Sequence, residues 1–144
     1  MKNILFIILL LATSQCIAGI SKFELEFGVI GVDKSNEYFI SEKTNRIPLR
    51  IKDTGFRFGF ILNSNTEYET QLKIIFPVAP KILSGSAEVA TIEKNILTYP
   101  VIQQAGKWSH VSWFDAGDPV GKWEYHLYVN KKLYRSIKFD VFKE

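Results

Sequence analysis

Alternation of apolar and polar side chains is the feature that most limits what this chain can fold into. Within residues 23–29, 56–62 and 70–76, the apolar side chains stand two positions apart. A period of two places them on one face of an extended strand, so each run predicts a half-buried β-strand. The third run ends at Pro77, which has no N–H to donate to a neighbouring strand.

Six further segments have the length and composition of strands: residues 46–52, 87–92, 95–102, 107–114, 122–129 and 133–142. Short groups rich in Gly, Asn, Asp and Ser separate them, as turns do in an all-β chain. Residues 33–44 are polar and are expected to form the longest loop. We predict an antiparallel immunoglobulin-like β-sandwich of about seven to nine strands, with a β-barrel as the alternative.

The first 18 residues have the three parts of a secretory signal peptide. Lys2 supplies a positive start, residues 4–12 are apolar, and residues 13–18 are small or polar. As a helix, the apolar run is too short to cross a hydrocarbon layer of about 30 Å. We therefore expect a signal helix that is cleaved after Ala18, a single domain over residues 19–144 with no membrane span, and a periplasmic or extracellular location.

Cys16, the chain's one cysteine, allows a second interpretation, since bacterial lipoproteins are cut just before an acylated cysteine. Gln15 stands where such a site needs a small residue, which favours ordinary signal cleavage. No cysteine follows, so no disulfide is expected in the folded domain. The formal net charge is +3 and both signs are interspersed, so nucleic acid is not an expected partner.

The spacing predicts a β-hairpin over residues 108–129, with its loop centred on Asp118. One face would then be apolar and belong to the core: Val111, Trp113, Trp123, Tyr125, Leu127 and Val129. The other face would bring four aromatic or imidazole side chains to the surface: Trp108, His110, His126 and Tyr128. Trp and Tyr often carry interface energy, so these four are candidate binding residues, although cross-strand aromatic pairs also stabilise sheets without binding anything.

His110 and His126 would be neighbours across this hairpin, with Cβ atoms about 5 Å apart. Two imidazoles without a third ligand make a poor metal site, so no metal or other cofactor is predicted. Asp115 and Asp118 fall short of the roughly 6–8 oxygens of a calcium site, and turn chemistry is favoured, with Asp118 before Pro119 as the cap. The sequence holds no Gly-x-Ser-x-Gly turn and no phosphate-binding glycine loop, which argues against enzyme activity.

Two registers are open for the last hairpin. A two-residue turn at Asn130-Lys131 would direct the apolar residues of the last strand away from the core. A loop one residue longer through Lys132, or an equivalent bulge, would place Leu133, Ile137 and Phe139 in the core. We favour the second register because it keeps the core continuous.

Several short motifs stand at matching places along the chain: Gly55-Phe-Arg-Phe-Gly-Phe60, a strand end at Phe76-Pro77, and Gly121-Lys-Trp-Glu-Tyr125 followed by Phe139-Asp-Val141. In these motifs the chain resembles the exported bacterial family called domain of unknown function 3859. The resemblance spans most of the chain after the signal. It implies an immunoglobulin-like sandwich and an exported location, and it carries no active site.

These observations predict a non-catalytic exported β-sandwich module that binds a protein or a cell-envelope component. One alternative is a small exported hydrolase or metal-dependent enzyme that uses His110, His126, Asp115 and Asp118. The other is a periplasmic carrier that holds an apolar ligand between its two sheets.

Overall fold

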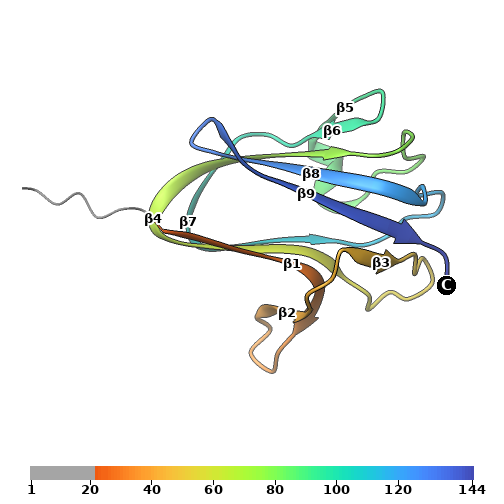
Figure 1. Ribbon diagram of the computed structural model, residues 1–144, viewed down its shortest axis with the longest axis horizontal. Helices are drawn as coiled ribbons and strands as arrows, with labels where there is room; N and C mark the ends of the chain where they lie inside the picture. The colour runs from red at the N-terminus through yellow and green to blue at the C-terminus, as the bar shows by residue number, and fades with distance from the viewer. Residues whose placement is uncertain (1–21) are drawn as a thin grey trace, which may run out of the picture.

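Two layers of β-strands face each other (Figure 1), and a core rich in aromatic side chains lies between them. The computed structural model describes residues 22–144, so the predicted signal peptide and Cys16 lie outside the described residues. In chain order the elements are β1 (Phe23–Val32), β2 (Tyr38–Glu42), β3 (Arg46–Pro48), β4 (Phe58–Ile75), the 3-10 helix η1 (Gly85–Val89), β5 (Thr91–Glu93), β6 (Ile96–Thr98), β7 (Ile102–Ser112), β8 (Gly121–Val129) and β9 (Lys132–Phe142). The predicted all-β sandwich is confirmed.

Strand β4 belongs to both layers. Its first part, residues 58–63, pairs with β1 and β7, and its last part, residues 70–75, pairs with β8 and β6. Between them the register against β7 shifts, from Asn63 to Glu67, and the strand curves from one layer into the other (Figure 1). Residues 63–65, whose Asn and Ser content is typical of a turn, therefore form a bend inside one strand.

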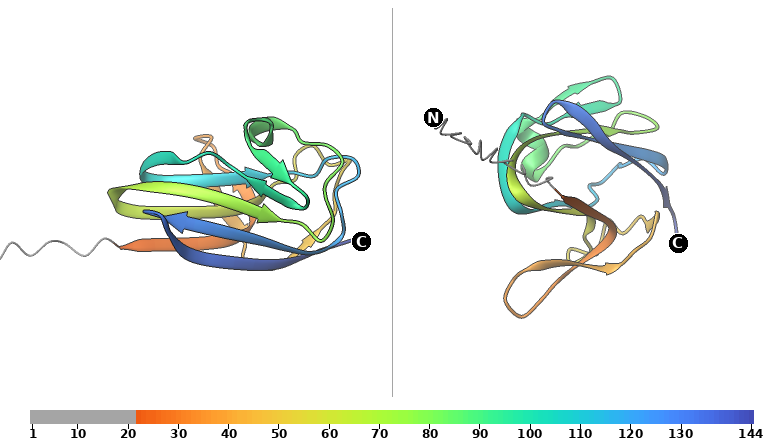
Figure 2. Two further views of the ribbon diagram at one scale, coloured as in Figure 1. Left: turned by 90° about the horizontal axis from the view of Figure 1, so that it is seen from above. Right: turned by 60° about the vertical axis from the view of Figure 1, so that its left-hand side comes forward.

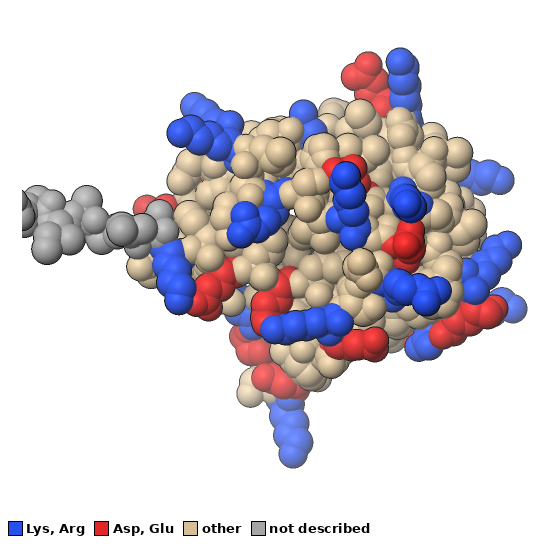
Figure 3. Space-filling model, in the orientation of Figure 1, with Lys and Arg blue, Asp and Glu red and all other residues tan. Residues whose placement is uncertain are grey.

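The two layers have strand orders β2-β1-β4-β7 and β5-β6-β4-β8-β9-β3. All pairs are antiparallel except β3 with β9. Figure 2 shows the curved β4 joining the layers at one side. On the face seen in Figure 3, Lys and Arg side chains alternate with Asp and Glu, and no large area carries a single sign of charge.

Aromatic rings from the two layers meet in the core. Phe27 lies 4.8 Å from Phe139, and Phe58 lies 6.2 Å from Trp123, measured between ring centroids. All four side chains belong to or pack on one buried cluster. Each such pair adds about 0.5–1.5 kcal/mol beyond the burial of its apolar area, so these contacts hold the layers together.

The predicted hairpin of residues 108–129 is wrong. β7 pairs with the first part of β4 and β8 pairs with the last part, so these two strands lie in opposite layers. The inward face of β8 is as predicted: Trp123, Tyr125, Leu127 and Val129 are buried. On β7 the faces are reversed, because Trp108 and His110 pack inward while Val111 is only partly buried and Trp113 is 39% exposed.

The last hairpin combines a two-residue turn with a bulge. Asn130 and Lys131 both have positive φ, 49° and 67°, as a tight hairpin turn requires. The register shifts by one residue between Leu127 and Tyr128, which restores the pairing of core positions. The predicted bulge is confirmed, and Phe139 is buried; the placement of Leu133 in the core is wrong, because this side chain is 52% exposed.

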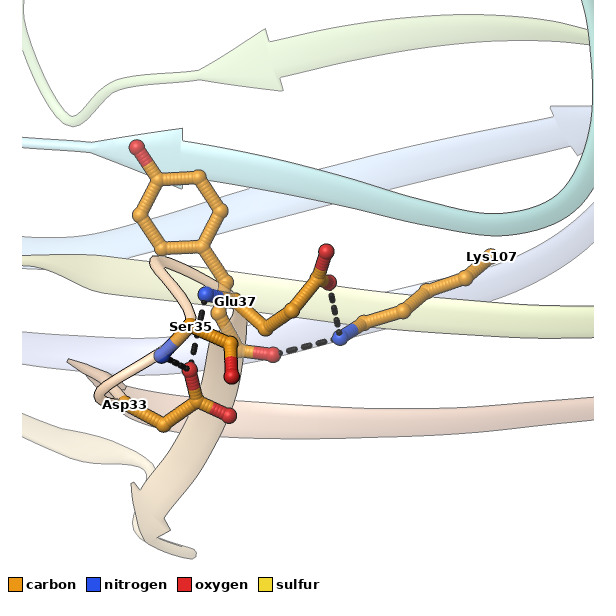
Figure 4. Close-up of polar contacts among 5 residues, drawn as sticks. Asp33, Ser35, Glu37 and Lys107 are labelled. Atoms are coloured by element: carbon orange, nitrogen blue, oxygen red, sulfur yellow. Dashed lines mark hydrogen bonds and ion pairs between the residues drawn. The ribbon is translucent and has the colours of Figure 1, made fainter.

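Two other predictions of local structure are corrected. Residues 33–44, expected to be a loop, contain β2, which pairs with β1. Asp33 closes this hairpin by accepting the N–H groups of Ser35 and Glu37, and Lys107 of β7 binds the carboxylate of Glu37 and the carbonyl oxygen of Tyr38 (Figure 4). The strand expected at residues 87–92 is mostly the 3-10 helix η1, followed by the short strand β5.

Gly59 offers a test of the β4–β7 pairing. Its φ is +148°, and a Cβ atom there would lie 2.0 Å from the backbone oxygen of His110. Gly106 also has positive φ, +67°, but a Cβ atom at that position would meet no other atom within 4 Å. We expect Gly59→Ala to lower the free energy of unfolding by about 3 kcal/mol or more, and Gly106→Ala by about 1 kcal/mol, in urea titrations. Equal losses would contradict this pairing.

Candidate functional site

The candidate site lies at the end of the sandwich where residues 113–120 cross from β7 to β8. A pocket of about 60 Å³ is enclosed there between the crossing segment, the region before η1 and the second layer. Its walls include apolar Phe76, Leu83 and Trp123, and its polar groups include Ser84, Ser112, Asp115 and Asp118. A small number of polar groups in an apolar cleft is the usual composition of a binding site.

Trp113 stands at the mouth of this pocket and is held in one position. Its indole N–H donates to Ser84 Oγ at 3.0 Å, and Ser84 in turn donates to Asp115 Oδ2 at 2.6 Å. The Arg57 guanidinium lies 5.5 Å from the ring centroid. Gly85 packs so closely that a Cβ atom there would come within 2.4 Å of the indole. The ring is therefore both exposed and fixed.

A second pocket, of about 330 Å³, lies on the other side of Trp113. It shares Trp113 and Asp115 with the first pocket and is also lined by Ile51 and Arg57. Ile51 is 40% exposed, and Ile82, which lines the first pocket, is 47% exposed. We call Ile51, Ile82 and Trp113 the end surface; it places three apolar side chains around two neighbouring hollows.

Asp118 caps the turn beside the pocket. Its Oδ2 accepts the backbone N–H of Asp115 at 2.8 Å, and its own N–H donates to the Asp115 carbonyl oxygen at 3.1 Å. Turn capping, the role favoured from the sequence for Asp118, is therefore what the structure shows for this residue, whereas the Asp115 carboxylate accepts the Ser84 hydroxyl. Burial raises the pKa of the Asp118 carboxyl to about 6, even though the hydrogen bond from Asp115 favours the charged form.

A chain of hydrogen bonds runs beneath the pocket. Ser112 Oγ lies 3.1 Å from His110 Nε2 and 2.9 Å from the hydroxyl oxygen of Tyr125. Burial lowers the pKa of His110 to about 4 and raises the pKa of Tyr125. Both groups are therefore uncharged near pH 7, and Ser112, which lines the pocket, bonds two neutral partners.

The four residues predicted to share one binding face do not do so. Trp108 and His110 point into the core from β7, and Trp108 packs edge-on against Phe60 at 5.0 Å. His126 and Tyr128 lie on the outer face of β8, in the other layer. The combined surface is wrong because it depended on pairing β7 with β8.

The alternative metal pair of His110 and His126 fails for the same reason. His126 Nε2 instead bonds Glu124 Oε1 at 2.8 Å, and Ser136 bonds the same carboxylate oxygen. These two hydrogen bonds, from Ser136 first and His126 second, lower the pKa of Glu124. Within residues 22–144, no group of three or more His, Cys, Asp or Glu side chains is arranged to hold a metal ion.

The sequence patterns do not identify Trp113 and Ser84 as site residues. Alternation with Val111 predicts Trp113 in the core, and Ser84 marks only a turn. Their contact joins positions 29 residues apart, and no local pattern encodes such a contact. The one available signal is the position of Trp113 directly before a loop rich in Asp and Gly, where strand alternation no longer fixes the face.

Comparison with solved structures defines the class of the fold. An immunoglobulin-like protein from Pseudomonas aeruginosa superposes with a TM-score of 0.56 at 17% sequence identity, over 85% of this chain and 96% of that chain. The chain therefore has an immunoglobulin-like β-sandwich fold. A β-glucosidase from Listeria innocua in complex with glucose matches with a TM-score of only 0.36 at 8% identity, over 85% of this chain and 16% of the enzyme. This similarity is too low to assign a fold or a function.

The family follows from the sequence comparison. Residues 25–142 match the model of the PM0630 beta sandwich domain, and the chain belongs to this family. The match supports the sandwich class that the sequence motifs implied, under a different family name. No curated protein matches the sequence. In the part of the chain that the structure describes, no helix is long and apolar enough to span a membrane.

Asp118 predicts a pH-dependent difference in stability between the wild type and Asp118→Asn. The folded-state pKa of about 6 exceeds the ordinary value of 3.8. The charged carboxylate is therefore less favourable in the folded protein than in the unfolded chain. Wild type should lose stability relative to Asp118→Asn as the pH rises from 4 to 6. Because the group is partly solvated, we expect a difference of about 1 kcal/mol at pH 7.5.

Thermal and urea unfolding at several pH values measure this difference. Asparagine keeps an oxygen that can accept the Asp115 N–H, so the turn itself is preserved. The two proteins should converge below the unfolded-state pKa of 3.8. A difference that stays constant across the pH range would contradict the assignment to Asp118.

Proposed function

We propose that this protein is a non-catalytic exported module that binds a protein or a cell-envelope component through its end surface. The observation that carries the proposal is Trp113, an indole that is 39% exposed yet held by Ser84, Gly85 and Arg57. A large side chain that is fixed before binding loses little conformational freedom on binding. Tryptophan is also among the residues that most often carry interface energy.

The position of the surface supports the same function. It lies at an end of the sandwich, where loops and strand termini from both layers meet. In immunoglobulin-like domains such ends present binding loops on a rigid scaffold. Ile51 and Ile82 extend the apolar area on the two sides of Trp113 and are not needed for the core.

Export belongs to the proposal because of the signal-peptide pattern at residues 1–18. A periplasmic or extracellular location and kinship with the domain of unknown function 3859 family rest on sequence patterns alone. Neither a cofactor nor nucleic acid is part of the proposed function.

The two alternatives have less support. The residues named for a hydrolase or metal enzyme are separated or engaged elsewhere: His110 is buried in one layer, His126 lies outside the other, Asp118 caps a turn, and Asp115 accepts the Ser84 hydroxyl. For a carrier, the pocket beside Trp113 holds about 60 Å³, whereas even benzene occupies engineered cavities of about 150 Å³. A lipid chain would require the region before η1 to move.

Trp113→Ala tests the proposal. The exported protein would be immobilised and exposed separately to the soluble periplasmic, membrane and cell-wall fractions of the cells that produce it. We expect the variant to lose about tenfold or more in affinity for the captured component, because an anchor of the interface is removed. Its free energy of unfolding should fall by only about 1 kcal/mol, since the ring is partly exposed.

Leu133→Ala is the matched control, since Leu133 is 52% exposed and lies on β9, away from the end surface. It should bind as wild type does. If Leu133→Ala loses as much affinity as Trp113→Ala, or if Trp113→Ala retains full affinity, binding does not use the end surface.

A further inference from the structure

Three of the four outer strands of this sandwich, among residues 22–144, are protected against pairing with another chain. β3 has three residues, among them Arg46 and Pro48; β5 has three and ends in Glu93; β2 has five and ends in Glu42. Short length, charge and proline are the usual means by which β-proteins keep sheet edges from associating.

The fourth outer strand, β7, is neither short nor interrupted by proline. It spans eleven residues, with its register against β4 shifted at Gly106, and in the described part of the chain it pairs with β4 alone. Its one charged side chain is Lys107, whose ammonium group is bound by Glu37 and by the carbonyl oxygen of Tyr38 (Figure 4). A long edge without free charge is a template for a further strand.

The backbone of β7 shows which groups are available. The His110 carbonyl oxygen is directed toward β4, where it lies next to Gly59. The N–H and C=O groups of successive residues in a strand point alternately to its two sides. Ser109 and Val111 therefore direct their backbone groups to the open edge. A groove of about 280 Å³ follows this edge and is lined by Tyr38, Ile102 and Trp108, among others.

We propose that β7 pairs antiparallel with β7 of a second copy of this chain, about a two-fold axis, so that the two first layers form one continuous sheet. An extended strand is the partner that satisfies alternate backbone donors and acceptors in a row. A second copy fits because a two-fold axis brings two identical edges together, so the edge must not repel itself. The one charged side chain of this edge, Lys107, is already paired with Glu37. Among the side chains of β7, like charges lie opposite each other only in the register that pairs Lys107 with Lys107 of the second copy.

This arrangement is independent of the proposed binding function. Antiparallel pairing directs the two copies of β7 in opposite directions, and Trp113 follows directly after β7. The two end surfaces therefore lie at opposite ends of the dimer, and both remain open. Failure of the dimer would leave binding by a monomer intact, and failure of the binding test would leave the dimer intact.

Sedimentation equilibrium of the exported protein measures the assembly, and hydrogen exchange locates it. We expect a dimer that dissociates on dilution. The amides of Ser109 and Val111 should exchange more slowly in concentrated than in dilute samples, whereas the amide of His110, which faces β4, should not change with concentration. A wild type that remains monomeric at its highest soluble concentration would overturn the proposal.

Two variants and a control identify the surface. Ser109→Pro removes an N–H that points to the open edge, and the double variant Ala105→Lys with Ser109→Lys adds charge along the same edge. Each should raise the dimer dissociation constant by about tenfold or more. The second variant serves where the proline prevents folding, which circular dichroism reports.

Ile92→Lys is the control, because it also adds a lysine, here a single one, at an exposed position on the outer strand β5. It should leave the dimer unchanged. A dimer that survives the double lysine variant, or that Ile92→Lys disrupts equally, would show that β7 is not the contact.

Discussion

The curvature of β4 is the constraint on which the rest of the structure depends. An 18-residue strand is too long to lie flat in one layer of so small a sandwich, and it supplies hydrogen-bonding edges to both layers. At the bend, where the β7 register shifts, Ser64 Oγ accepts the N–H of Thr66, and the Tyr68 hydroxyl donates to the Gly106 carbonyl oxygen. Side chains thus bond backbone groups where the ladder is interrupted.

The site follows from this curvature. Because β4 places β7 and β8 in opposite layers, the segment between them has to cross the open end of the sandwich. The crossing leaves Trp113 outside and brings Trp123 inside, where its indole N–H donates to the Pro119 carbonyl oxygen at 2.8 Å. Two tryptophans ten positions apart therefore have different roles: Trp123 closes the core, and Trp113 is held at the surface by Ser84.

The sequence predicts the buried face of a strand better than it predicts which strand pairs with it. Alternation identifies the buried side of β8, and continuity of the core identifies the bulge in the last hairpin. Alternation cannot say which strand lies alongside, because any pairing leaves the same side chains on the same face. On β7 it also fails to choose the face, since Trp108 and His110 alternate with Val111 and Trp113, and both sets contain an aromatic ring.

The candidate site is less predictable for the same reason. Asp118 can be found because turn capping is a local interaction, and the structure shows it in that role. The contact of Ser84 with Trp113 depends on how two distant segments meet at the end of the sandwich. The hairpin of β1 and β2 resembles a loop in sequence because most residues of β2 are exposed on both faces, which removes the period-two pattern.

Burial and charge on β7 are linked through His110. An exposed histidine would carry partial charge near its ordinary pKa of 6.5, but burial lowers the pKa of His110 to about 4, and Ser112 satisfies its ring nitrogen. The imidazole is therefore neutral and adds no charge to the strand. Lys107 is the remaining charge, and Glu37, from the hairpin of β1 and β2, binds it. Packing inside the sandwich and an ion pair outside it thus leave the edge of β7 neutral, which is the condition under which two identical edges can pair.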